Sequence, residues 1–291
     1  SAGTYQNLAE QTSCKQTDAG YYSTGTTTFN GVLTNTASAQ EPCPVGTWQN
    51  ETGKSSCKDA SAGHYSEGTV IVNGVLRNLA NQEIACPAGQ YQDQTGQSSC
   101  DDSDAGYYVQ TTGQSAQIPC PAGTYQGSTG QTACIDADDG HFSRGTIIIN
   151  GFVQETATQQ TACVAGTWQA DTGQSDCDDA DLGYFVAQAG ENTQEPCAIG
   201  TYQDVAGQSS CKDADAGYYS EGTQGGSGVM SSVTTDASSQ IPCPAGTYQS
   251  TTGQSSCIDA SAGHYSSGTE IVNGQVVSTA TQEIPCDAGT W

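Results

Sequence analysis

The sequence predicts an all-β protein, an extended rod of tandem small disulfide-stapled β-hairpin modules with almost no helix. Three observations predict this fold. Cysteine pairs recur at one fixed spacing, a glycine and an aromatic residue recur at fixed positions of every repeat, and Asn-Gly dipeptides stand between β-branched runs. Short repeated units rich in turns fold against their neighbours rather than around one large core.

The composition supports a stapled repeat and excludes several classes of protein. Only 34% of the 291 residues are apolar, which is too few for one large core, while cysteine occurs 14 times. So many cysteines indicate an oxidising compartment, so we expect a secreted or cell-surface protein. The net charge of −25 argues against nucleic acid as a partner. The sequence contains no run of about 18 apolar residues, so it predicts no membrane span in this segment.

The cysteine spacing defines a repeat of 17 residues. Six cysteine pairs are each separated by 14 positions, and the gaps between pairs vary from 20 to 32 positions. The unit Cys-Pro-Ala-Gly-Thr-Tyr-Gln, seen at Cys120 and Cys243, is matched position by position in residues 103–117 and 180–194, where other residues replace both cysteines. A cystine module is therefore followed by a cysteine-free module, which in most copies is enlarged by an insertion.

This frame divides the chain as one continuous array of module pairs. Since the frame is incomplete at both ends, we expect the chain to be a window on a longer array. The pairs cover residues 1–42, 43–85, 86–119, 120–162, 163–196, 197–242 and 243–285, and the next pair starts at 286–291.

The insertions in the cysteine-free modules carry a hairpin signal. Asn-Gly stands between β-branched or apolar runs in 27–33, 70–76, 147–153 and 270–277. This pattern is typical of a two-residue type I′ turn, which needs positive φ at both central residues. The copy after Cys211 has glycines 225, 226 and 228 instead, and we expect a longer, looser loop there.

Two residue types persist through both kinds of module. Glycine stands three positions after each module start, and an aromatic residue stands five positions after it. Since the chain is poor in Leu and Met, we expect these rings to form the buried apolar content of the modules. The aromatic residues are Tyr5, Tyr22, Trp48, Tyr65, Tyr91, Tyr108, Tyr125, Phe142, Trp168, Phe185, Tyr202, Tyr219, Tyr248, Tyr265 and Trp291.

The disulfide pairing is predicted from which cysteines are lost together. In the cysteine-free modules both positions of the 14-spaced pair are lost together, as expected if they are partners. Each closed ring of 15 residues contributes about 3 kcal/mol by restricting the unfolded chain. Cys14 and Cys286 then bond to partners outside the chain, although pairing across the longer gaps would pair all 14 internally. The predicted pairs are Cys43–Cys57, Cys86–Cys100, Cys120–Cys134, Cys163–Cys177, Cys197–Cys211 and Cys243–Cys257.

The motif from Cys120-Pro-Ala-Gly-Thr-Tyr125 to Cys134 resembles the cysteine-rich repeats of ephrin-receptor-like proteins and the first module of tumour-necrosis-factor receptor domains. The likeness covers the whole chain and implies a module type, but no particular function. That family places a third cysteine after the second, as Cys-x-x-Cys. Here Ala60, Ser103 or another small residue occupies that position, so the resemblance alone does not imply the family's ligand-binding geometry.

The residues with chemical potential favour a structural role. His64, His141 and His264 stand where other copies have tyrosine, and no nucleophile motif is present, so we predict that the chain is not an enzyme and needs no cofactor. The Asp-rich turns offer weak calcium candidates, but no copy has the glutamate of an EF-hand loop. Asn50, in Asn-Glu-Thr, is a candidate glycosylation site. The calcium candidates are Asp102, Asp104, Asp136, Asp138, Asp179, Asp181, Asp213 and Asp215.

These observations predict a structural repeat protein of an extracellular filament or surface appendage. We expect it to self-associate, or to join other fibrous surface proteins, through the repeated hairpins. The nearest analogues by resemblance are fibrous surface proteins of protists and algae, such as the mastigoneme subunits of flagellar hairs. The alternative is the stalk or ligand-binding ectodomain of a receptor or adhesin. Its best candidate site is the irregular loop 225–232, with Met230.

Overall fold

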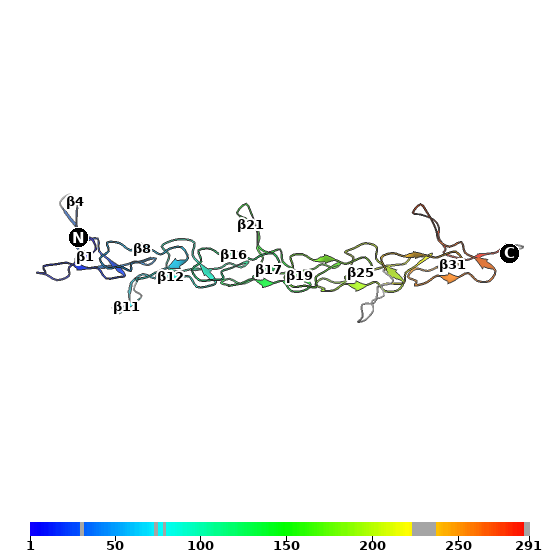
Figure 1. Cartoon of the computed structure of the whole chain (residues 1–291), viewed down its shortest axis with the longest axis horizontal. Coiled ribbons are helices and arrows are strands. Elements are labelled where there is room, and N and C mark those ends of the chain that lie inside the picture. The colour runs from blue at the N-terminus through cyan, green and yellow to red at the C-terminus, as the bar shows by residue number, and fades with distance from the viewer. Residues whose placement is uncertain (30–31, 73–74, 78–79, 223–236, 288–291) are drawn as a thin grey trace. The chain divides into compact units, whose positions relative to one another are not determined.

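The computed structural model describes residues 1–29, 32–72, 75–77, 80–222 and 237–287. Within these ranges the only regular structure is short antiparallel β-strand pairs, and no helix occurs (Figure 1). This confirms the predicted all-β fold of stapled hairpin modules.

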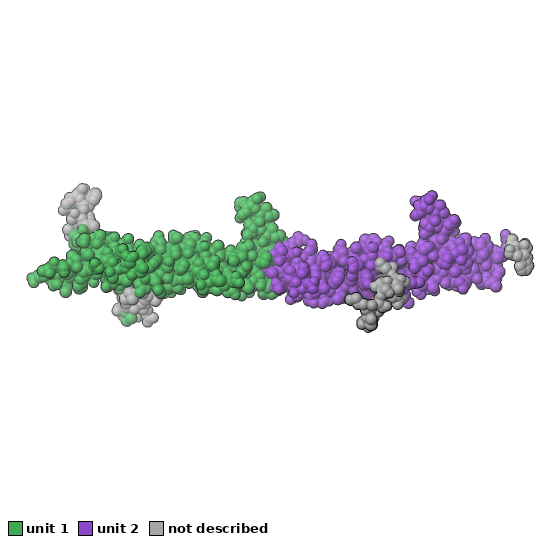
Figure 2. Space-filling view, viewed as in Figure 1, with its two compact units in different colours: residues 1–121, 125–135, 145–159 green, residues 122–124, 136–144, 160–291 purple. Residues whose placement is uncertain are grey.

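Contacts group the chain into two compact units with interleaved boundaries (Figure 2). Unit 1 holds residues 1–121, 125–135 and 145–159. Unit 2 holds residues 122–124, 136–144 and 160–291.

A tight turn and two very short strands make each module. In the module 43–59, the amide of Thr47 donates to the carbonyl of Pro44 at 3.0 Å. Gly46 occupies the third turn position with φ of 84°, as a type II turn requires. The chain then pairs Thr47 with Asp59 and Trp48 with Lys58.

The strands of the cystine modules share this register. The paired strands are β1 (Thr4–Tyr5) with β2 (Lys15–Gln16), β7 (Thr47–Trp48) with β8 (Lys58–Asp59), β13 (Gln90–Tyr91) with β14 (Asp101–Asp102), β23 (Thr167–Trp168) with β24 (Asp178–Asp179), β27 (Thr201–Tyr202) with β28 (Lys212–Asp213), and β31 (Thr247–Tyr248) with β32 (Ile258–Asp259). The module 120–136 holds β17 (Thr124–Tyr125) and β18 (Ile135–Asp136).

The cysteine-free modules form equivalent hairpins. Their paired strands are β3 (Tyr21–Tyr22) with β6 (Glu41–Pro42), β9 (His64–Tyr65) with β12 (Ile84–Ala85), β15 (Tyr107–Tyr108) with β16 (Ile118–Pro119), β19 (His141–Phe142) with β22 (Thr161–Ala162), β25 (Tyr184–Phe185) with β26 (Glu195–Pro196), β29 (Tyr218–Tyr219) with β30 (Ile241–Pro242), and β33 (His264–Tyr265) with β36 (Ile284–Pro285).

Four insertions form a second type of hairpin, here called the projecting hairpins. They are β4 (Thr27–Phe29) with β5 (Val32–Asn35), β10 (Val70–Val72) with β11 (Val75–Arg77), β20 (Ile147–Ile149) with β21 (Phe152–Glu155), and β34 (Glu270–Val272) with β35 (Gln275–Ser278). Figure 2 shows the arm of residues 145–159 standing out from unit 1.

The turns of two projecting hairpins confirm the type I′ prediction. Asn150 and Gly151 have φ of 52° and 78°, and Asn273 and Gly274 have φ of 51° and 76°. The other two Asn-Gly turns, at 30–31 and 73–74, lie outside the described residues, as do the loop 225–232 and the repeat positions Gly289 and Trp291.

The expectation that the aromatic rings form the interior was wrong. Most rings at that repeat position are half-buried, Tyr202 is 9% exposed, and Tyr265 is 49% exposed. Full burial falls instead on the opening cysteine, on the small residue that replaces it, such as Ala60 and Ser103, and on the side chain after the ring. Backbone hydrogen bonds hold successive modules close together, and small or polar side chains fill most of the buried positions.

Candidate functional site

Backbone hydrogen bonds join each module to the next. Between the modules 43–59 and 60–85, Gly46 donates to the carbonyl of Ser66 at 2.7 Å and accepts from the amide of Ala60 at 2.9 Å. Gln49 then donates to the carbonyl of Ala80 at 2.7 Å. Equivalent bonds recur at the other described joints, so the joint depends on the backbone and tolerates different side chains.

At most joints the glycine is required by close packing. A Cβ atom at Gly46 would lie 2.0 Å from the carbonyl oxygen of Gly96, which belongs to the module two positions further along. The same approach recurs between Gly166 and the carbonyl of Gly207, at 2.3 Å. Most of the described modules therefore contact both the neighbouring module and the module beyond it. The sequence indicated that a side chain would block this position, but not what it would meet.

A buried glutamine closes the loop of each complete cystine module, and sequence reasoning missed it. The side chain of Gln203, 2% exposed, donates from Nε2 to the carbonyl of Ser210 at 2.7 Å. Its Oε1 accepts from the amide of Val205 at 3.1 Å. Gln49 and Gln249 make the same pair of bonds. The signal was present, because Gln follows the aromatic in every cystine module.

Serine replaces this glutamine in most cysteine-free modules and bonds across the joint. The hydroxyl of Ser66 donates to the carbonyl of Thr47 at 2.8 Å and accepts from the amide of Gly68 at 3.3 Å. In the two modules without an insertion, Val109 and Val186 occupy the same buried position.

Six disulfides close the cystine modules, and they join the cysteine pairs that the sequence predicted. Each has a sequence separation of 14 and a Cα–Cα distance of 5.8 Å. Cys14 and Cys286 are exposed and unpaired within the chain.

A pair of polar side chains, here called the polar clasp, closes each cysteine-free module where the disulfide is missing. In the module 103–119 the amide of Asp104 donates to Gln117 Oε1 at 2.6 Å, and Gln117 Nε2 donates to Asp104 Oδ2 at 2.7 Å. Gln117 stands at the position of the closing cysteine.

In two clasps the carboxylate belongs to the second residue of the pair instead of the first. The amide and hydroxyl of Ser61 donate to the carboxylate of Glu83 at 2.7 and 2.9 Å. The clasps are Asp18–Gln40, Ser61–Glu83, Asp104–Gln117, Asp138–Gln160, Asp181–Gln194, Asp215–Gln240 and Ser261–Glu283.

The clasp has an electrostatic consequence at Glu283. Hydrogen bonds from the amide and hydroxyl of Ser261 lower the pKa of the Glu283 carboxyl below its ordinary value, with a smaller contribution from His264. The carboxylate form is therefore favoured in the folded module.

The calcium candidates divide into two structural classes. Asp104, Asp138, Asp181 and Asp215 use their carboxylates in polar clasps. The other four lie against a glycine of the second module after their own, as Asp59 does at Gly96. This glycine stands ten positions after the opening cysteine. The four are Asp102, Asp136, Asp179 and Asp213. Among the described residues, no three His, Cys, Asp or Glu side chains gather closely enough to hold a metal ion.

The histidines bond locally. His64 Nδ1 lies 3.4 Å from the Ser61 hydroxyl, and His264 Nδ1 lies 3.3 Å from that of Ser261, so both extend a clasp. His141 Nδ1 lies 3.1 Å from the carbonyl of Asp139. The structure thus places all three beside turns.

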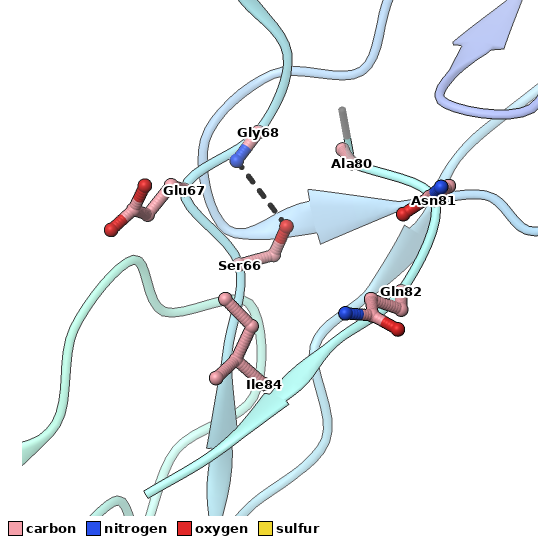
Figure 3. A pocket seen from close by; sticks show the side chains of 7 residues that line it. All are labelled: Ser66, Glu67, Gly68, Ala80, Asn81, Gln82 and Ile84. Carbon is pink, nitrogen blue, oxygen red and sulfur yellow. Dashed lines mark hydrogen bonds between the residues drawn. The ribbon is translucent and has the colours of Figure 1, made fainter. Parts of the chain in front are cut away.

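Two shallow cavities lie on the modules. One of about 240 Å³ sits beside the base of the β10–β11 hairpin, where the amide of Gly68 donates to the hydroxyl of Ser66 (Figure 3). In the same region the amide of Ala80 donates to the Thr69 hydroxyl at 3.0 Å. These groups already serve the joint. The first cavity is lined by Ser66, Glu67, Gly68, Ala80, Asn81, Gln82 and Ile84. The second, of about 460 Å³, is lined by Phe142, Val164, Thr167, Asp176, Cys177, Asp178 and Asp179.

The projecting hairpins expose apolar side chains. In β20–β21, Ile148 and Ile149 are 44% and 54% exposed, and Phe152 and Val153 are 72% and 50% exposed. In β34–β35 the exposed set is Ile271, Val272, Val276 and Val277. Val32 and Val75 are likewise exposed on the other two.

The sequon lies at an exposed loop. Asn50 follows β7 and its Oδ1 accepts from Lys58 at 3.2 Å, while Lys58 also lies 5.0 Å from the ring of Trp48. Glu51 pairs with Lys54 at 2.6 Å.

Comparisons with known proteins assign no relative. No family model matches the chain, and no curated protein matches it. The described part of the chain contains no helix long and apolar enough to cross a membrane. The six disulfides indicate an oxidising compartment.

Proposed function

We propose that the chain is a structural repeat protein of an extracellular filament or surface appendage, without catalytic activity, that self-associates through its projecting hairpins. The observation that carries this proposal is the uniformity of the joints. Each uses the same backbone bonds whatever the side chains, which suits a part whose role is length and regularity. The clasps preserve that geometry where a disulfide is absent.

Charge and sugar chemistry fit an external setting. A net charge of −25 keeps the bodies of separate copies apart and hydrated. Asn50 is exposed, so an N-linked glycan there can extend into solvent. Peptide mapping after enzymatic deglycosylation, which converts a glycosylated Asn50 to aspartate, tests that part of the proposal.

Electron microscopy of the purified, oxidised chain without any partner tests the main proposal. Filaments with a regular axial repeat are the expected result. Separate particles at every concentration would contradict it and would favour the stalk or ectodomain of a receptor or adhesin, in which the modules space a ligand site from the cell.

A further inference from the structure

The projecting hairpins are dispensable for the module that carries them. The modules 103–119 and 180–196 lack one, yet they keep the same strand register and joint bonds. Gly106 donates to the carbonyl of Gln126 at 2.7 Å, as Gly140, in a module with a projecting hairpin, donates to that of Gln169 at 2.7 Å. The hairpins therefore serve something other than the stack of modules.

The hairpins are built like unprotected sheet edges. A lone two-stranded hairpin is only marginally stable in water, and exposed edges are usually blunted by Lys or Pro. Strands β20–β21 and β34–β35 contain neither residue. In each hairpin a two-residue turn joins the strands, so the residue pair next to the turn is hydrogen-bonded across the hairpin and the following pair is not. That following pair is Ile148 with Val153 in one hairpin and Ile271 with Val276 in the other, and its backbone N–H and C=O groups point outward.

The distribution of charge indicates which partner can approach these edges. The four hairpins carry only Arg77, Glu155 and Glu270 as charged residues, in a chain of net charge −25. Two copies of the chain repel each other through their bodies but not through these nearly neutral apolar arms. The arms are thus the parts at which like-charged copies can approach.

We infer that each projecting hairpin pairs edge to edge with a projecting hairpin of a second copy of this chain, forming an intermolecular four-stranded antiparallel sheet. The pairing joins one strand of each hairpin, so in a given arm it satisfies the outward backbone groups of either Val153 or Ile148. This inference rests on the proposed function, since it names the contact through which copies assemble. Recurrence along the chain makes the contact multivalent.

The test compares two variants of equal charge. The hairpin variant carries Val32→Glu, Val75→Glu, Val153→Glu and Val276→Glu, at positions that are 66%, 58%, 50% and 52% exposed. The control variant carries Val45→Glu, Val164→Glu, Ile199→Glu and Val205→Glu, at module positions that are 62%, 65%, 63% and 49% exposed.

Sedimentation in rising NaCl measures association. Wild-type association should strengthen with salt, because screening removes repulsion between the bodies. The hairpin variant should associate at least about tenfold more weakly, equivalent to about 1.4 kcal/mol, while the control stays within about twofold of wild type. Equal loss in both variants, or no loss in either, overturns the inference and leaves filament formation standing. A wild-type chain that never associates overturns the proposed function as well.

A second variant guards against misfolding. Residues 143–160 are replaced by a copy of residues 109–117, which removes β20–β21 and leaves a short module of a kind that folds in this chain. Hydrogen exchange then reads the edge directly. Assembly should slow the amide of Ile148 or that of Val153, whichever lies on the paired strand, at least about tenfold in wild type. Unchanged exchange of these amides in assembled material overturns edge pairing, as does undiminished association of the graft variant.

Discussion

A seventh disulfide should form when Ser103→Cys and Gln117→Cys are combined, because the module 103–119 has the hairpin register of the cystine modules. Tyr107 pairs with Pro119 as Thr47 pairs with Asp59. The new ring would contain 15 residues, like the six native rings, and would stabilise the module by about 3 kcal/mol through the unfolded chain.

Two losses offset part of that gain. The buried Ser103 hydroxyl accepts from the amide of Gln131 at 3.0 Å and donates to its carbonyl at 3.3 Å. The clasp between Asp104 and Gln117 is also removed. Hydrogen bonds of this kind contribute about 1 kcal/mol each when buried and less when exposed, which leaves a net gain of about 1–2 kcal/mol.

Mass spectrometry and hydrogen exchange measure the outcome. The disulfide lowers the intact mass by two hydrogens, and the amides of Gly106 and Cys120, which bond at this joint, should exchange about tenfold more slowly. Gln117→Cys alone is the control and should speed their exchange. The reasoning is refuted if the paired thiols stay reduced while the native disulfides form, or if the disulfide forms and exchange accelerates.

Four further outcomes follow from the same contacts. Gly46→Ala should destabilise its joint by about 2 kcal/mol or more, through the steric clash with the facing carbonyl and the positive φ, and local hydrogen exchange as slow as in wild type would contradict this. Gln249→Leu leaves two backbone groups without their hydrogen-bond partner and should speed amide hydrogen exchange in the loop about tenfold or more. Gln254→Leu, at an exposed site, should not, and equal effects of the two substitutions would disprove the role of the buried glutamine. Because hydrogen bonds from Ser261 lower the pKa of Glu283 from its ordinary value of 4.5, the clasp stabilises the module fully above that pH and is lost as pH falls through the lowered value. A carbon-13 titration should give a midpoint below the ordinary value, and one at or above it would count against the clasp. Reduction of all disulfides should abolish the β-sheet circular dichroism of the cystine modules, and a spectrum unchanged by reductant would rule out stapling as the source of their order.

The sequence by itself determined what is encoded within one repeat. The module length, the disulfide pairs and the type I′ turns at Asn150 and Asn273 all follow from residues that lie close together in the chain. Turn chemistry and covalent closure act over such short separations, so a repeated pattern is enough to predict them. The same evidence limited the function to a class, because this module type occurs in proteins of different functions.

Only the tertiary structure decided what fills the spaces between modules. The aromatic rings were the natural choice for the interior, yet most of them are half-buried, whereas Gln203 is 2% exposed. Modules two positions apart meet as closely as Gly46 and Gly96 do. Asp104 presented a metal-binding pattern in sequence, whereas folding brings Gln117 onto its carboxylate. Burial and polar pairing depend on which distant residues meet and how closely, and that is a property of the packed modules rather than of any single repeat.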